Sequence, residues 1–123
     1  MTGEAHVELT RRALAGFLRD QAEWRTWKSE ECPEEWRNAH SAAQLLTLAE
    51  VVEGLPVEDE CLRMLAMVHA EDAATLTPGA QAALLAGGYG FEHDQDAGAW
   101  LRRFVEAAVA ATVDDADDER RWL

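Results

Sequence analysis

Apolar residues recur along the first part of this chain at spacings of three, four and seven, which is the period of an amphipathic helix. Over about residues 4–28 they form one broad arc, whereas Glu8, Arg12, Arg19 and Glu23 fall on the opposite side. The pattern therefore predicts one long first helix that packs along a single face. The apolar arc comprises Val7, Leu9, Ala13, Leu14, Phe17, Leu18 and Trp24.

Prolines and a glycine mark the next two helices. Acidic residues after Pro33 favour a helix start there, and the stripe that begins at Trp36 continues to Gly54, where a glycine followed by Pro56 predicts the end. Between residues 45 and 52 the apolar positions go almost all the way round, so we expect that end to be buried. A third helix is predicted to start near residue 56 or 57, and its first turn would hold Glu58, Asp59 and Glu60.

Two more helices follow. Thr77 is a typical N-cap and Pro78 a typical first helical residue for a helix to about Ala86, and Asp94 or Asp96 can cap the last one. No segment alternates with a period of two, so the sequence predicts an all-α fold. We expect a single compact domain over residues 1–123, built as an irregular bundle of about five helices, with an acidic tail at 114–123 that can fray. The face of the last helix comprises Trp100, Leu101, Phe104, Val105, Ala108 and Ala111.

Charge narrows the range of functions. The chain has 123 residues, of which 48% are hydrophobic, and its 24 acidic and 11 basic residues give a net charge of −13. Such an excess argues against direct binding of nucleic acid or anionic membranes, because both require clustered cations. Twelve of the acids lie within residues 32–99 beside only Arg37 and Arg63. This bias suits a protein that binds a basic surface, as inhibitors, immunity proteins and DNA mimics do, although solubility alone also accounts for it.

The sequence indicates a cytoplasmic protein. The first ten residues carry Glu4 and Glu8 and lack a basic segment before an apolar run, so no secretory signal is predicted. No stretch has the length and apolar character of a membrane span. Cys32 and Cys61 form no CxxC motif, and we expect both to be free thiols.

No motif predicts an enzyme or a metal centre. None of the four histidines has a glutamate three residues before it, so the Glu-x-x-His signature of di-iron bundles is absent, and we expect packed or surface histidines. His69-Ala70-Glu71 resembles half of a zinc-deaminase motif but lacks the PCxxC that must follow. Neither Ser29 nor Ser41 lies in a GxSxG setting. We therefore assign no catalytic residue, no metal ligand and no cofactor, and an enzyme is the least favoured class.

A glycine-rich segment at residues 87–94 supports an alternative function. Glycines permit close approach of a ligand, and Tyr89, Phe91 and His93 lie among them. The segment is either a connection whose aromatic residues plug the core or a contact loop for a small ligand or metal. In the second case the protein is a ligand-binding helical protein.

Five tryptophans complete the picture. Trp24, Trp36 and Trp100 lie on predicted core stripes, whereas Trp27 and Trp122 are candidates for a partner or dimer contact. The leading hypothesis is a non-catalytic acidic interaction or regulatory protein whose partner presents a basic surface. A homodimeric structural subunit is a further alternative. The predicted contact residues are Glu34, Glu35, Glu58, Asp59, Glu60, Trp27 and Trp122.

Overall fold

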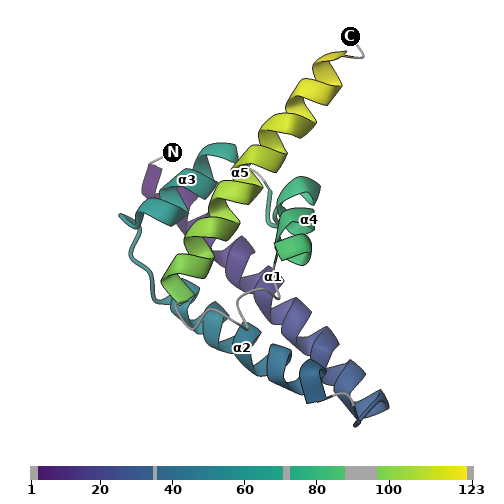
Figure 1. The fold of residues 1–123 in the computed structure, drawn as a ribbon. Helices are drawn as coiled ribbons and strands as arrows, with labels where there is room; N and C mark the ends of the chain where they lie inside the picture. The colour runs from purple at the N-terminus through teal and green to yellow at the C-terminus, as the bar shows by residue number, and fades with distance from the viewer. Residues whose placement is uncertain (1–2, 35, 71–72, 88–96, 122–123) are drawn as a thin grey trace.

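A computed structural model of the chain shows an all-α fold (Figure 1). It describes residues 3–34, 36–70, 73–87 and 97–121, with side chains for 3–34, 39–70, 73–85 and 98–112. These residues contain five helices and no strand, as the hydrophobic period predicts. The helices are α1 (Gly3–Glu31), α2 (Trp36–Glu53), α3 (Glu60–Val68), α4 (Pro78–Gly87) and α5 (Ala97–Arg121).

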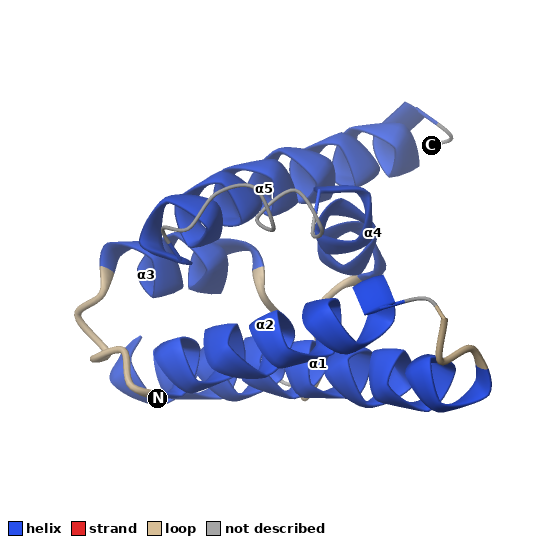
Figure 2. Cartoon of the chain, turned by 60° about the horizontal axis from the view of Figure 1, so that its bottom comes forward, coloured by secondary structure: helices blue, strands red, loops and turns tan. Residues whose placement is uncertain are grey.

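The helices form two layers. α1 and α2 make an antiparallel hairpin, and α5 lies across from it with α3 and α4 packed against its side (Figure 2). α3 also contacts α1, which joins the two layers at the end where α1 begins. The opposite end of the hairpin, where α1 ends and α2 begins, lies beyond α3 and α4 in both views. This end is called the hairpin tip below.

The core lies between the layers and follows the predicted stripes. Leu14 and Leu18 of α1 pack against Leu45, Leu48 and Val52 of α2, and all five are buried. Burying one such side chain contributes about 1.5–3 kcal/mol. From the second layer, the buried residues include Leu62 and Leu65 of α3, Leu84 of α4, and Trp100, Leu101 and Val105 of α5.

The start of α3 differs from the sequence prediction. The backbone from Pro56 to Asp59 forms a turn, in which the Asp59 amide donates to the Pro56 carbonyl oxygen at 3.0 Å. Asp59 is the N-cap, because its carboxylate accepts from the Leu62 amide at 3.1 Å and its ψ of 130° is not helical. The helix therefore begins at Glu60. An aspartate side chain competes for the first amides of a helix, and this competition decides the boundary.

The other helix ends are closer to expectation. Thr77 Oγ1 accepts from the Ala80 amide at 3.2 Å, and Pro78 is the first residue of α4. Gly54 follows the last residue of α2, as predicted, but it does not adopt a positive φ. The amides of Gly54 and Leu55 donate to the last carbonyl oxygens of α2, and the helix goes no further because Pro56 has no amide with which to continue it.

The prediction that α2 is buried all round at residues 45–52 is wrong in part. Leu45, Leu48 and Val52 are buried, but Leu46 and Val51 are more than one-third exposed. They flank the buried side of α2, and Val51 lines a pocket together with residues of α3 and α5. The apolar positions at this end of α2 therefore extend beyond the side that packs into the core.

Candidate interaction surface

The structure separates the predicted contact residues into two groups. Trp27 and Glu34 lie at the hairpin tip, whereas residues 58–60 lie at the turn between α2 and α3. The 18 residues of α2 stand between them, a length of about 27 Å. The residues thus do not form one surface. Glu35 and Trp122 lie outside the described residues, as do Tyr89, Phe91 and His93 of the alternative ligand site.

Two of the acids at the α2–α3 turn have structural partners. Asp59 caps α3, and the Glu60 carboxylate accepts from Nη2 of Arg102 on α5 at 3.3 Å. Glu58 is exposed. This turn therefore offers fewer carboxylates to a partner than the sequence suggests.

The predicted core position of Trp24 is wrong. Its side chain is 47% exposed, while Trp100, predicted in the same way, is 3% exposed and stacks on Phe104. Phe17 and Gln21 are half-buried and line one pocket with residues 74–76. Trp24 follows Phe17 by seven residues, about 10 Å along the helix. Trp24 does not line this pocket, and a position on the same stripe therefore faces solvent.

Trp24 belongs to an exposed stripe on α1. Asp20, Trp24, Trp27 and Glu31 follow one another at spacings of four, three and four, and all four are exposed. This spacing places them along one side of the helix, turned away from buried Leu18 and Ala22. Exposed Glu23 and Glu30 flank them. We call this surface the Trp24–Trp27 stripe; it comprises Asp20, Glu23, Trp24, Trp27, Glu30 and Glu31.

Sequence reasoning found only Trp27 among these six residues. The available signal was the four-three-four spacing of two tryptophans between two acids. That signal was hidden because Trp24 also continues the apolar arc of Phe17. Whether Trp24 is part of the core or of the exposed stripe depends on how far along α1 another element packs against it.

Cations already lie over both indole rings. Nζ of Lys28 is 5.6 Å from the centroid of the Trp24 ring and 5.2 Å from that of Trp27. The guanidinium carbon of Arg25 is 5.1 Å from the Trp24 centroid. Cations approach the negative faces of aromatic rings in this way. Nζ of Lys28 also lies 3.7 Å from a carboxylate oxygen of Glu31. The stripe thus has Glu23 and Glu30 on one flank and Arg25 and Lys28 on the other.

A second polar site joins α1 to α3. Nε2 of His6 donates to the Ala66 carbonyl oxygen at 2.8 Å, and the His69 amide donates to the same oxygen at 3.3 Å. The rings of His6 and His69 stack with their centroids 5.9 Å apart. Nδ1 of His6 is buried and has no hydrogen-bond partner. His69 is a packed core histidine, as predicted, but its contact with His6 was not foreseen.

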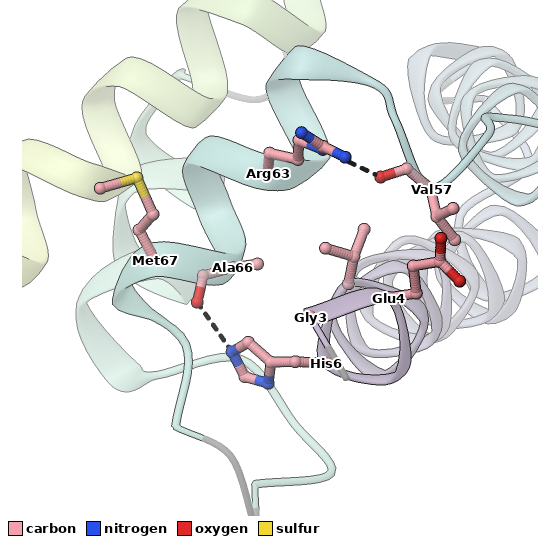
Figure 3. Close-up of a pocket in the computed structure, with 8 residues that line it drawn as sticks. Gly3, Glu4, His6, Val57, Arg63, Ala66 and Met67 are labelled. Atoms are coloured by element: carbon pink, nitrogen blue, oxygen red, sulfur yellow. Dashed lines mark hydrogen bonds between the residues drawn. The ribbon is translucent and has the colours of Figure 1, made fainter. Parts of the chain in front are cut away.

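A pocket of about 430 Å³ opens beside His6 (Figure 3). Its walls are mostly apolar, and Arg63 reaches across to the Val57 carbonyl oxygen at 3.4 Å. No three histidine, cysteine or acidic side chains in the described ranges are grouped so that they could hold a metal ion. The pocket is lined by Gly3, Glu4, His6, Val7, Val57, Arg63, Ala66 and Met67.

Both cysteines are free thiols, as predicted. Cys32 is exposed at the hairpin tip, whereas Cys61 is half-buried between α3 and α5. Burial raises the pKa of the Cys61 thiol, and the nearby Asp59 carboxylate raises it further. A thiol held protonated in this way is a poor nucleophile and a poor metal ligand.

Among the helices that the structure describes, none combines the length and apolar character needed to cross a membrane. Comparisons of the chain with protein families, with curated proteins and with solved structures found no match. The five described helices define the protein as an all-α bundle. Its surfaces are the features that bear on function.

Proposed function

We propose that this protein is a non-catalytic interaction protein that binds a partner with a basic surface through the hairpin tip. The observation that carries the proposal is the Trp24–Trp27 stripe, in which two half-exposed tryptophans (47% and 51%) lie among exposed carboxylates. Tryptophan is strongly enriched at the residues that dominate binding energy. Carboxylates around such an anchor favour a cationic partner.

The charge of the whole chain supports the same choice. A net charge of −13 produces a negative field that attracts basic partners and raises their association rate, by about 10–1000-fold at low salt. Glu34 and Glu58 are exposed and contribute to this field. We assign them to steering and not to one contact surface, because they lie at opposite ends of α2.

The test is capture of a partner from a lysate of the source organism, with elution by a salt gradient. We expect a defined basic protein that is retained at low salt and released as salt rises. Replacing Trp24 and Trp27 by alanine together should lower its affinity at least tenfold, since both side chains lie at the centre of the stripe. Replacing Leu46 and Val51 by alanine is the matched control, because these are exposed apolar residues on α2, and this change should leave affinity within about twofold.

Two results would contradict the proposal. One is the absence of any specific basic protein at low salt. The other is a captured partner whose affinity is unchanged both by the tryptophan substitutions and by Asp20→Asn, Glu23→Gln and Glu30→Gln combined. Competition by duplex DNA for a captured partner would identify it as a nucleic-acid-binding protein whose site this chain occupies.

A further inference from the structure

We infer that the element bound by the Trp24–Trp27 stripe is a basic amphipathic helix of another protein and not a second copy of this chain. The inference rests on the proposed function and specifies the chemistry of the partner. It starts from the spacing of the stripe. Positions four, three and four apart form the seam by which one helix packs along another at a shallow angle. Asp20 and Glu31 close this seam at either end, about 16 Å apart.

The stripe is also the continuation of a face that is already covered. Residues 74–76 line a pocket with Phe17, Asp20 and Gln21 of α1, whereas Trp24 and Trp27 are about half-exposed. An added helix would lie over Trp24 and Trp27 without displacing any described element. It would extend the packing of α1 to the hairpin tip.

Charge makes a second copy a poorer match for this position than a basic helix. In the antiparallel pairing that brings both tryptophans of both copies together, Trp24 faces Trp27 and Asp20 faces Glu31 of the other copy. In the parallel pairing each acid faces its own equivalent. Both arrangements therefore place Asp20 opposite a carboxylate, and like charges directly opposed are unfavourable. At the Glu31 end, Lys28 lies 3.7 Å from the carboxylate and offsets part of the repulsion. The net charge of −13 on each copy adds to this repulsion.

The complementary helix has a definable pattern. It carries two large apolar residues that face Trp24 and Trp27, and an arginine or lysine four residues outside each of them. The two bases are thus eleven residues apart and meet Asp20 and Glu31. Further bases belong on the flank that faces Glu23 and Glu30, whereas the flank facing Arg25 and Lys28 should lack them, since those cations lie on that side of the stripe.

The probe for this inference is a synthetic helical peptide in which Arg-x-x-x-Leu-x-x-Leu-x-x-x-Arg forms the contact side. A permuted peptide of the same composition, with the leucines on opposite sides of its helix, is the control. Both are labelled and titrated with the full chain, and binding is read from fluorescence anisotropy. We expect the patterned peptide to bind at least tenfold more tightly than the permuted one.

Variants of the chain locate the contact. Trp24→Ala with Trp27→Ala should abolish the difference between the two peptides. Glu50→Gln with Glu58→Gln removes two negative charges outside the stripe, and it should weaken the binding of both peptides equally and by less than threefold. Sedimentation velocity at tens of micromolar should show no self-association that depends on Trp24 and Trp27.

Three results would overturn the inference. Equal binding of the two peptides would show that only the negative field matters. A dimer that is lost on substitution of Trp24 and Trp27 would make a second copy the occupant. A captured natural partner that binds equally well to the tryptophan variant would show that its contact lies outside the stripe. In that case the protein would still bind a basic partner, but not through the Trp24–Trp27 stripe.

Discussion

The imidazole ring of His6 stacks on that of His69, with the ring centroids 5.9 Å apart. The pair joins the start of α1 to the end of α3, because Nε2 of His6 also donates to the Ala66 carbonyl oxygen. Residues near the start of α1 are thereby fixed to the second layer.

Replacing His6 by alanine should lower the free energy of unfolding by about 1–2 kcal/mol, because one buried hydrogen bond and the ring contact are lost. Urea unfolding followed by circular dichroism measures this change. A double-mutant cycle with His69→Ala should give a coupling energy of about 0.5 kcal/mol or more, as expected for residues in contact. Purely additive effects would contradict the stacked arrangement.

Asp59 should act on stability through its cap. Asp59→Ala should cost about 1 kcal/mol, because the Leu62 amide loses its acceptor, whereas Asp59→Asn should cost much less since an amide oxygen also caps. Glu58→Ala, one residue before, should change stability by less than about 0.5 kcal/mol. Thermal or urea unfolding of the three variants checks the order, and equal effects of Asp59→Ala and Glu58→Ala would show that the cap contributes nothing.

Two adjacent leucines of α2 provide a direct test of the layer arrangement. Leu45 is 1% exposed and Leu46 is 39% exposed. Leu45→Ala should cost about 2–5 kcal/mol, because it leaves a cavity between the layers. Leu46→Ala should cost less than about 1 kcal/mol. A reversed order in urea unfolding would mean that α2 is rotated about its axis relative to the structure described here.

The two thiols should differ in reactivity. Burial and the Asp59 carboxylate raise the pKa of Cys61 above its usual 9.0, so less of it is thiolate at neutral pH. We expect exposed Cys32 to react several-fold faster with iodoacetamide at pH 7.5 in the folded protein. The variants Cys32→Ser and Cys61→Ser assign each rate to one thiol. The difference should vanish in 6 M guanidinium chloride, a concentration at which roughly all domains of this size are unfolded. Faster reaction of Cys61 would contradict its burial.

An ion pair between the hairpin helices should make stability depend on acid pH. Nε of Arg19 donates to Oε1 of Glu53 at 2.6 Å, and this hydrogen bond holds the pKa of Glu53 below its usual 4.5. The folded protein then binds fewer protons at this site than the unfolded chain. The stabilisation is therefore complete above about pH 4.5 and is lost as the pH falls through the lower folded pKa.

The measurement compares the midpoints of urea unfolding of the natural chain and of Glu53→Gln between about pH 3 and pH 7. This range includes the pH at which an ordinary glutamate titrates. The gap between the two proteins should be largest above pH 5 and should shrink below pH 4, values that lie about half a unit either side of the ordinary pKa. Other carboxylates titrate equally in both proteins, so they cancel in the comparison. A gap that does not change with pH would show that Arg19 does not stabilise the ionised form of Glu53.

Much of the fold could be predicted from the sequence because helix periodicity and capping are local properties. The spacing of apolar residues by three and four predicts the buried sides of α1 and α5, and Thr77-Pro78 predicts the start of α4. The start of α3 was predicted too early, with all three acids in its first turn, because the backbone turn at Pro56 and the capping by Asp59 were not foreseen.

Much less of the candidate site could be predicted from the sequence. The sequence suggested one acidic contact surface, but α2 separates Glu34 from Glu58 by its whole length. It also placed Trp24 in the core, and the contact between His6 and His69 could not be seen across the 62 residues between them.

The sequence by itself determined which side of each helix is apolar, where most helices end, and that the chain is strongly acidic. Each of these follows from neighbouring residues or from their sum. Only the tertiary structure decided how far along α1 another element lies over it. Since Phe17 packs against the core and lines a pocket with residues 74–76, whereas Trp24 is 47% exposed, one apolar stripe is core at one end and exposed surface at the other.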